Sequence, residues 1–377
     1  MTDHLATRVV HFSTVHPATD VRILRKECAT LRRAGYDVTL FARGVDAVVD
    51  GVRVVPVNEY SNRAARIVVG PLRLFRSLLA ERADIYHFHD PELLPIGLAM
   101  RVCGKRVIYD AHEWVPGDVA SKPYLHPAAA RILSRVAGAL ERLAARTLSH
   151  VVAATPFIAE QLAGDRVTVI RNYPDPEELL SHATAATTTP APGAGVVVYV
   201  GSLSDERCGA AMLGAMRLVA DMRPQIRLLA GGTLEDGLTT EGLPNVEHRG
   251  LIDRRGVSDL LSTGLVGLVL LRDLPNCRDA MPTKYFEYLA AGLAVIVSQS
   301  TRPIADTTRQ LQCGVVVDET DPAAIASAIV QLCDNPSEAR AMGQRGRTAV
   351  VAQLNWQPEG ERLVALYDSL SRSARGR

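Results

Sequence analysis

The sequence lacks several features that would assign it to a specialised class of protein. Its six cysteines lie far apart and form no Cys-x-x-Cys pair, which argues against a disulfide framework or a cysteine-based zinc site. Aromatic residues make up 5% of the 377 residues and the net charge is +1, so the strong basic bias and stacking platforms of a nucleic-acid-binding protein are missing. No apolar run is long enough to span a bilayer, and no signal-peptide core precedes the first strand-like run. These absences predict a cytoplasmic protein.

The chain instead shows a repeated alternation of β-rich apolar runs and helical patterns. The predicted strands are Arg8 to Phe12, Asp37 to Ala42, Arg53 to Val57, Ile85 to His89, Arg106 to Asp110, His150 to Ala154, Val167 to Ile170, Val196 to Val200, Gln225 to Ala230, Val246 to Arg249, Gly267 to Leu271, Ala294 to Ser298 and Gly314 to Val317. Prominent helical patterns cover Val21 to Ala34 and Ala128 to Leu148. This alternation predicts the α/β class, with parallel sheets covered by helices on both faces.

The alternation divides the chain into two halves. Residues 181–195 are poor in core-forming side chains and rich in Thr, Ala, Pro and Gly, which is typical of a linker. We therefore expect doubly wound, Rossmann-like domains over 1–180 and 196–354, with a C-terminal helix over 355–377. Two such domains would leave a cleft between the carboxyl ends of their strands, where ligands of these sheets bind.

The segment from Asp279 to Glu287 carries the strongest functional signal. It predicts a short helix that starts near Pro282 and is closed by Gly292. The free amides at the helix start would suit a diphosphate; this start comprises Met281, Pro282, Thr283 and Lys284. The two carboxylates would then accept hydrogen bonds from hydroxyl-rich groups on either side, which is the layout of a nucleotide sugar. The alternative interpretation is an ordinary amphipathic helix with two solvated acids.

Glycine-rich turns after three other predicted strands would complete a donor site. Gly201 and Ser202 follow one strand and lead through Arg207 into a helix, so the turn and its cation form a reasonable phosphate cradle. Gly232 and Gly250 follow the next two strands, where the backbone can approach a base or ribose closely. A surface arginine and ordinary turns remain the alternative.

Polar residues also follow three strands of the first half. They are His16 and Asp20, His89 and Asp90, and His112 and Glu113. Because the carboxyl ends of parallel strands meet at one edge of a sheet, we expect all six to face the same site. His87 and His89 alternate on one strand and could suggest metal, but no third ligand stands out, so we predict no metal site.

The Asp279 to Glu287 segment resembles the acidic-x7-acidic signature of the family-4 retaining glycosyltransferases, in the glycosyltransferase B (GT-B) superfamily. The resemblance covers nearly the whole chain, including "RNYPD" and the tail "NWQPEGERLVALYDSL". It implies the GT-B fold, in which the last helix packs on the N-terminal domain. It also implies that Glu287 holds the ribose hydroxyls and Asp279 those of the donor sugar. The chain departs from the family pattern at several positions: Asp279 is usually Glu, Ser202 is usually Arg, Arg207 is usually Lys and Ala294 is usually Pro, and Cys208 precedes Gly209.

The resemblance implies retaining transfer of a sugar from a UDP- or GDP-sugar to a hydroxyl of a glycan, lipid-linked or small-molecule acceptor, without a cofactor. His112 would contact the donor sugar near the reacting carbon, and Asp279 would bind that sugar. Arg207, Lys284 and the helix amides would stabilise the leaving diphosphate. Asp20, Asp90 and Glu113 would orient acceptor hydroxyls, beside His16 and His89. The alternatives are an epimerase or phosphorylase on the same architecture, or an inactive nucleotide-sugar-binding subunit.

One predicted helix of the first half carries two different faces. Its arginines at 131, 135, 142 and 146 fall within roughly 60° of one another at about 100° per residue. Its apolar residues occupy the other side: Ile132, Leu133, Val136, Leu140 and Leu143. Docking of the basic face on an anionic membrane is one interpretation. The other is a solvated face on a helix whose apolar side packs into the first domain, and the lack of Trp or Phe for insertion favours it.

Overall fold

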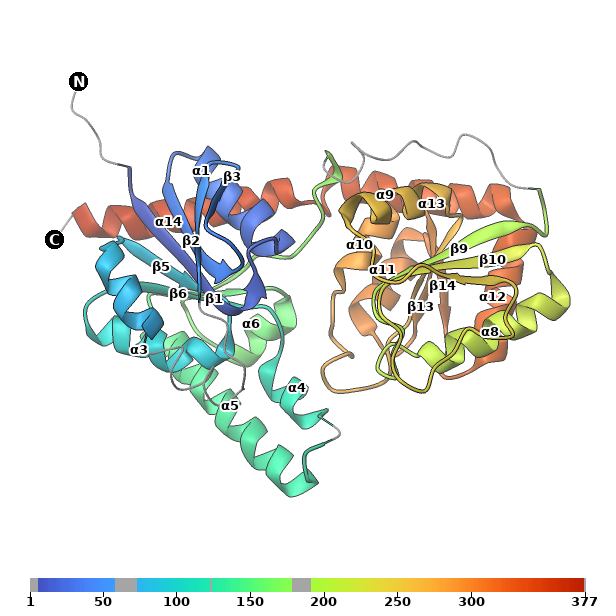
Figure 1. Cartoon of the computed structure of the whole chain (residues 1–377), viewed down its shortest axis with the longest axis horizontal. Coiled ribbons are helices and arrows are strands. Elements are labelled where there is room, and N and C mark those ends of the chain that lie inside the picture. Colours follow the sequence, from blue (N-terminus) through green and yellow to red (C-terminus); the bar gives the residue numbers. More distant parts are fainter. Residues whose placement is uncertain (1–5, 58–72, 123, 178–190, 376–377) are drawn as a thin grey trace. The chain divides into compact units, whose positions relative to one another are not determined.

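The computed structural model describes residues 6–57, 73–122, 124–177 and 191–375. The chain forms two compact units (Figure 1). The first unit comprises Met1–Asn172 together with Trp356–Arg377, and the second comprises Tyr173–Asn355. The predicted linker, 181–195, lies largely outside the described residues.

The first unit is built on an eight-stranded sheet with the order β3-β4-β2-β1-β5-β6-β7-β8. The strands are β1 (Arg8–Pro17), β2 (Asp37–Arg43), β3 (Ala47–Val49), β4 (Val52–Pro56), β5 (Ile85–Phe88), β6 (Arg106–Ala111), β7 (His150–Ala153) and β8 (Val167–Val169). All pairs are parallel except β3 with β4. The chain winds outward from β1 in both directions, so β1 and β5 flank the point where the strand order reverses, and ligands bind at such points.

Helices cover this sheet on both faces. They are the π-helix η1 (Val21–Cys28), α1 (Ala29–Arg33), the 3-10 helix η2 (Pro91–Leu93), α3 (Leu94–Val102), α4 (Val115–Ala120), α5 (Pro127–Thr147), α6 (Pro156–Leu162) and α14 (Trp356–Arg375). The C-terminal α14 belongs to this unit, as the resemblance implied. Its Trp356 Nε1 donates to Thr30 Oγ1 over 2.9 Å, and its buried Tyr367 reaches the sheet.

The second unit has a six-stranded, fully parallel sheet with the order β11-β10-β9-β12-β13-β14. The strands are β9 (Gly195–Val200), β10 (Ile226–Gly231), β11 (Val246–His248), β12 (Val266–Val269), β13 (Ala294–Ser298) and β14 (Gly314–Val317). The helices are α8 (Gly209–Met222), α9 (Arg254–Thr263), α10 (Thr283–Ala290), α11 (Arg302–Leu311), α12 (Pro322–Asp334) and α13 (Pro336–Ala352). This strand order is that of a doubly wound nucleotide-binding sheet, with the reversal between β9 and β12.

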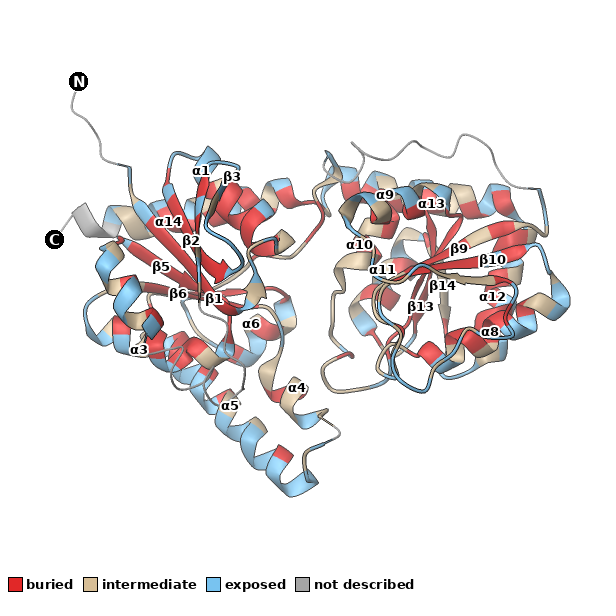
Figure 2. Cartoon of the chain, viewed as in Figure 1, coloured by how far each residue is buried: buried red, intermediate tan, exposed pale blue. Residues whose placement is uncertain are grey.

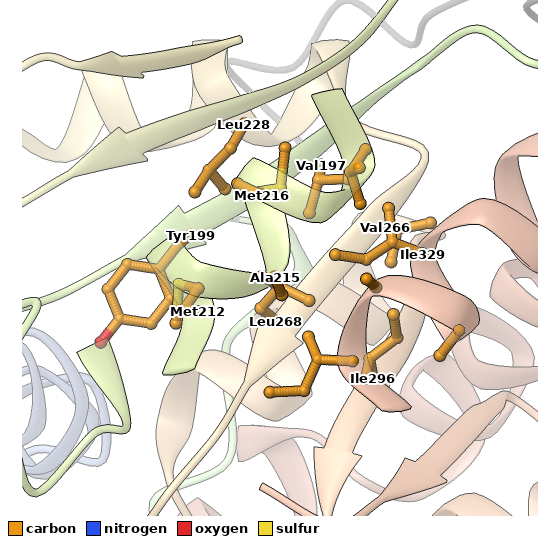
Figure 3. Packing of buried hydrophobic residues seen from close by; sticks show 14 of the residues in the cluster. Val197, Tyr199, Met212, Ala215, Met216, Leu228, Val266, Leu268, Ile296 and Ile329 are labelled. Atoms are coloured by element: carbon orange, nitrogen blue, oxygen red, sulfur yellow. The ribbon is translucent and has the colours of Figure 1, made fainter. Parts of the chain in front are cut away.

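The core of the second unit explains why the sequences of most of its strands are continuous apolar runs. Both faces of the sheet are covered, so neighbouring residues along a strand are buried on opposite sides (Figure 2). On one face Val197 and Leu228 from the sheet pack with Met212 and Met216 of α8, and Ile329 of α12 joins them (Figure 3). Both sheets, which are parallel apart from the β3–β4 pair, confirm the predicted α/β class. The thirteen predicted strands all form, and β3, which has only three residues, was not predicted.

Candidate active site

The three predicted donor-site glycines of the second unit lie together at the carboxyl ends of β9, β10 and β11. The Gly201 amide donates to the carbonyl of Gly231 over 2.8 Å, and the Gly232 amide donates to that of Gly250 over 2.7 Å. A Cβ atom at Gly232 would lie 2.0 Å from the Gly201 carbonyl oxygen, so only glycine allows this approach. The backbone of Gly201, Gly232 and Gly250 therefore forms one continuous surface next to the reversal point of the sheet.

Lys284 of α10 extends to this glycine surface. Its Nζ atom would lie 2.8 Å from a Cβ at Gly201, and it lies 4.2 Å from the ring centroid of Tyr199. The Tyr199 hydroxyl donates to the Ser202 carbonyl over 2.6 Å and so fixes the turn. Burial, followed by the positive charge of Arg207, lowers the pKa of Lys284 to about 7. The second unit thus holds two cations close enough to repel each other, an arrangement that favours an anion.

The start of α10 has no side-chain cap among the residues that the structure describes. Its N-cap residue, Pro282, makes no capping hydrogen bond through its side chain. The first amides of the helix, those of Thr283 and Lys284, therefore lack intrahelical acceptors. The sequence predicted a start near Pro282 and a stop at Gly292, and the helix ends at Ala290 with Gly292 in a left-handed conformation.

Both signature carboxylates are held by arginines. Arg254 Nη1 donates to Glu287 Oε1 over 2.7 Å, and Arg302 Nη2 lies 2.7 Å and 2.5 Å from the two Asp279 oxygens. The side chains of Glu287 and Asp279 are only 13% and 16% exposed. The interpretation as two solvated acids on an amphipathic helix is therefore wrong. Each acid is oriented by the first residue of a neighbouring helix, a feature that no local pattern indicated.

In the first unit, residues from the ends of β1, β5 and β6 converge as predicted from their positions. The ring centroids of His16 and His112 are 5.2 Å apart, and His16 Nδ1 lies 3.1 Å from Asp20 Oδ2. The hydrogen bond to Asp20 raises the pKa of His16. Burial would raise the pKa of Asp20, but hydrogen bonds from His16 and the Ile23 amide lower it to about 2. Asp20 also caps η1 through this amide.

Asp90 is buried and bonded entirely within the protein. It accepts hydrogen bonds from Ser13 Oγ at 3.0 Å, Thr14 Oγ1 at 3.1 Å and the Val15 amide at 3.3 Å. These bonds shape the turn that carries His16. Asp90 was predicted to contact an acceptor, but it positions this turn instead, because its side chain is only 1% exposed. Glu113 is exposed beside His112.

His112 is anchored by a buried ion pair that the sequence did not reveal. Its Nε2 atom lies 2.7 Å from Asp110 Oδ2, and Arg22 binds both oxygens of that carboxylate, at 2.8 Å and 2.7 Å. Burial would raise the pKa of Asp110, but Arg22 and then His112 hold it well below its usual range. Asp110 is therefore an anion that accepts the Nε2 proton of His112. The His112 side chain remains 17% exposed, with Nδ1 as its other polar ring atom.

Beneath His112 lies a buried chain of hydrogen-bonded rings. His89 Nδ1 lies 3.2 Å from Asp110, His89 Nε2 lies 3.0 Å from His11 Nδ1, and Tyr367 bridges His11 at 3.1 Å and His87 at 2.8 Å. Burial lowers the pKa of all three histidines, so they are neutral. Because the Asp110 anion accepts from His89 Nδ1, each donor in the chain is fixed in turn. His89 Nε2 accepts from His11 Nδ1, His11 Nε2 accepts from the Tyr367 hydroxyl, and the Tyr367 oxygen accepts from His87 Nδ1. His89, predicted to contact an acceptor, is a buried member of this chain.

Two further potential ligands, which did not stand out in the sequence, lie near His87 and His89. His11 and Glu27 join them, with one ligand atom from each of the four residues within 4.8 Å of the others. Burial, followed by the charge of Asp110, raises the pKa of Glu27 well above its usual range. Arg22 Nε lies 3.1 Å from Glu27 Oε1, so a cation already faces this carboxylate. We therefore interpret the three histidines as part of the buried ring chain, beside a Glu27 carboxyl that faces Arg22 but has no hydrogen-bond partner among the described residues.

Two protein-family models match the sequence of this chain. The family model described as "Glycosyltransferase Family 4" matches residues 21–178, and that described as "Glycosyl transferases group 1" matches residues 184–349. The chain belongs to the family-4-like glycosyltransferases of the GT-B superfamily. This confirms the resemblance noted in the sequence.

Individual relatives are more distant. A GDP-mannose-dependent monoacylated alpha-(1-6)-phosphatidylinositol monomannoside mannosyltransferase from Corynebacterium glutamicum is 28% identical over 165 residues, which is 42% of this chain and 43% of the relative. A glycogen synthase from Mycobacterium tuberculosis is 26% identical over 214 residues, 55% of this chain and 50% of the relative. The matched segments thus span half or less of these relatives.

Solved structures share the fold over almost the whole chain. Sucrose-phosphate synthase from Thermosynechococcus elongatus has a TM-score of 0.76 at 18% identity, covering 97% of this chain and 100% of that protein. HepE from Anabaena, in complex with UDP and glucose, has a TM-score of 0.68 at 13% identity, covering 96% and 100%. At these identities the likeness establishes the GT-B fold alone.

Proposed function

We propose that this protein is a retaining glycosyltransferase that moves a sugar from a nucleoside-diphosphate donor to a hydroxyl acceptor. The observation that carries the proposal is the convergence of Gly201, Arg207, Lys284 and the uncapped start of α10 in the second unit. This set offers a glycine backbone, two cations and free amides to a diphosphate. The relatives support it, since one is named as GDP-mannose-dependent and one fold neighbour was solved with UDP and glucose.

The proposed diphosphate site has a second cation even though Ser202 stands where the family pattern has arginine. Arg207 can make a bidentate contact with phosphate, and Lys284 approaches the Gly201 turn from α10 and supplies the second charge. An anionic diphosphate beside Lys284 favours its protonated form, so the lysine is charged when the donor is bound. Glu287 then accepts hydrogen bonds from the ribose and Asp279 from the donor sugar, with Arg254 and Arg302 holding the two carboxylates in place.

The transfer needs stabilisation of the leaving diphosphate more than a protein nucleophile. As the bond from the sugar to the diphosphate breaks, negative charge grows on the phosphate, where Arg207, Lys284 and the amides of α10 stabilise it. The acceptor hydroxyl attacks the same face of the sugar carbon and passes its proton to the departing phosphate oxygen. No covalent sugar-enzyme intermediate is required. His112, fixed by Asp110, presents Nδ1 to a hydroxyl of the donor sugar.

The first unit would bind the acceptor through the pair His16 and Asp20. His16, whose pKa is raised, and Asp20, whose pKa is lowered, lie in partly exposed positions and are able to donate to and accept from hydroxyl groups. The acceptor is proposed as a glycan, a lipid-linked sugar or a small molecule that presents such hydroxyls. No cofactor is needed for this chemistry.

A donor screen followed by a turnover assay tests the proposal. Nucleoside diphosphates and nucleotide sugars should raise the Tm, because a ligand that binds only the folded state stabilises it by mass action. The matching nucleoside monophosphate should have a smaller effect, since it lacks the second phosphate. Slow release of nucleoside diphosphate from the stabilising donor without acceptor would identify an active transferase. Stabilisation without any release or transfer would indicate an inactive binding subunit, and no stabilisation by any nucleotide would refute the donor site.

A further inference from the structure

Helix α5 exposes the apolar side that amphipathic patterning predicts to be buried. The side that packs on the first unit carries small residues and one acid: Ala130, Gly138, Glu141, Ala144 and Ala145. The large apolar residues point outward instead, with exposed fractions between 38% and 60%: Ile132, Leu133, Val136, Leu140 and Leu143. Most of α5 is correspondingly coloured as exposed (Figure 2). The prediction that this apolar side packs into the first domain is therefore wrong.

The exposed half of α5 also carries a row of cations without matching acids. Arg131, Arg135, Arg142 and Arg146 are all exposed, and they lie on the helix directly beside the apolar stripe. Among the described residues, no carboxylate lies within salt-bridge distance of any of the four. The single acid of α5, Glu141, faces inward and accepts a hydrogen bond from the buried Tyr109 hydroxyl at 3.1 Å. Burial raises the pKa of Glu141 to about 7, so even this charge is weakened.

We propose that this outer half of α5, which we call the docking face, binds the surface of an anionic lipid bilayer. The docking face comprises Arg131, Ile132, Leu133, Arg135, Val136, Leu140, Arg142, Leu143 and Arg146. Its apolar stripe enters the boundary between headgroups and acyl chains, while the adjacent arginines contact lipid phosphates. An apolar stripe alone would suit a second copy of the chain equally well. The four arginines, which have no carboxylate within salt-bridge distance among the described residues, favour an anionic surface, because such a surface attracts each of them.

Two neighbouring features fit the same surface. A pocket of about 190 Å³ beside α5 is lined by Arg135 and Arg142 together with Trp114 and the inward-facing Glu141, so two of the four arginines border a recess next to the docking face. Tyr124, just before α5, is 65% exposed and combines an apolar ring with a polar tip. The contact is peripheral, since no helix among the described residues has the length and apolar character needed to cross a bilayer.

Co-sedimentation with lipid vesicles tests the docking face. The intact protein should bind vesicles of phosphatidylcholine mixed with phosphatidylglycerol and bind pure phosphatidylcholine far more weakly. Changing all four arginines to glutamine (R131Q, R135Q, R142Q, R146Q) should weaken this binding by about fivefold for each charge removed. Changing the stripe (I132S, V136S, L143S) should also weaken it, because less apolar area is buried. A matched control removes four exposed arginines from other surfaces: R73Q, R76Q, R82Q and R217Q.

The outcomes separate the possible occupants. Loss of binding in both α5 variants and retention in the control supports the proposal. Equal vesicle binding by the four-arginine variant and the intact protein overturns it, as does no binding by the intact protein. A dimer that the I132S, V136S, L143S variant converts to a monomer, with no vesicle binding, would identify the face as a protomer interface and also overturn it. The inference does not depend on catalysis, because nucleotide stabilisation measured on each variant reports the donor site and the fold separately.

Discussion

The Nε2 atom of His112 lies 2.7 Å from Oδ2 of Asp110, and this contact makes the partly exposed imidazole dependent on a fully buried anion. Arg22 binds the same carboxylate through two nitrogens and keeps it ionised. The orientation of His112 is therefore set from within the core. Because the His112 side chain is 17% exposed, whereas the Asp110 that holds it is fully buried, removal of the imidazole should affect turnover more than folding.

Substitution of His112 should separate catalysis from stability. We expect His112→Ala to lower kcat on the order of 10²-fold, the scale for removing one group that interacts with developing charge, with a Tm near that of the unchanged protein. Parallel steady-state kinetics and thermal unfolding of His112→Ala would show this. An activity that falls only in proportion to lost stability would instead make His112 a structural residue.

The ion pair beneath His112 should be costly to break. Asp110→Asn removes from the buried Arg22 guanidinium the carboxylate that binds two of its nitrogens, and among the described residues only Glu27 remains beside it, which should lower the free energy of unfolding by about 3–5 kcal/mol. Asp118→Asn is the matched control, since it removes one partner of a more exposed pair with Lys122 and should cost less than about 1 kcal/mol. Urea unfolding of both variants measures the two costs. Equal losses of unfolding free energy would contradict the conclusion that the buried pair is the costlier one to break.

The signature carboxylates should matter for donor affinity. We expect Glu287→Ala to raise the donor Kd through lost ribose hydrogen bonds, each contributing on the order of 1.5–3 kcal/mol when charge-assisted. Arg254→Gln should have a smaller effect of the same sign, because the carboxylate remains but loses its orienting partner. Titration calorimetry with the stabilising nucleotide measures both, with the exposed Glu241→Ala as control. Unchanged donor binding and turnover in both Glu287→Ala and Asp279→Ala would refute these roles.

Much of the fold follows from the sequence because parallel strands buried on both faces must be apolar throughout. The same rule placed His16, His112 and Gly201 at strand ends, where chain direction alone brings such residues to one edge of a sheet. The partners of these residues could not be predicted. Arg22 and Asp110 are 88 positions apart, and no local pattern connects them.

Helix α5 illustrates a second limit. Its periodic pattern located an amphipathic helix correctly, but a pattern does not state which face is buried. Small residues such as Gly138 allow close packing on one side, where a Cβ would already lie 3.3 Å from Pro116. The large apolar side was left exposed. The hydrophobic stripe of a helix can therefore mark a surface for a partner as well as a core.

Lys284 should give donor binding a characteristic pH dependence. Its pKa is lowered to about 7, so without donor its charge is progressively lost as the pH rises from 7 to 9. Protonation must then accompany binding of the anionic donor, and we expect the donor Kd to rise by up to about tenfold per pH unit over this range. Donor affinity therefore falls as the pH rises, whereas the free energy of unfolding without donor should rise. The unfolded lysine, with a pKa near 10.4, binds more protons than the folded one between pH 7 and 10, so this group's contribution to the free energy of unfolding increases with pH there.

Lys284→Met should remove both trends, leaving weak donor binding that is nearly constant from pH 7 to 9. Lys122→Met is the matched control, because its interaction with Asp118 raises the pKa of Lys122 and keeps it charged over the same range. Donor titrations at pH 7, 8 and 9 on the three proteins distinguish the cases. The buried histidine chain of the first unit contributes little to the trend, because its imidazoles are already neutral at pH 7. If the Lys284→Met protein kept the full pH dependence of the unchanged protein, Lys284 would not be the cation that meets the diphosphate.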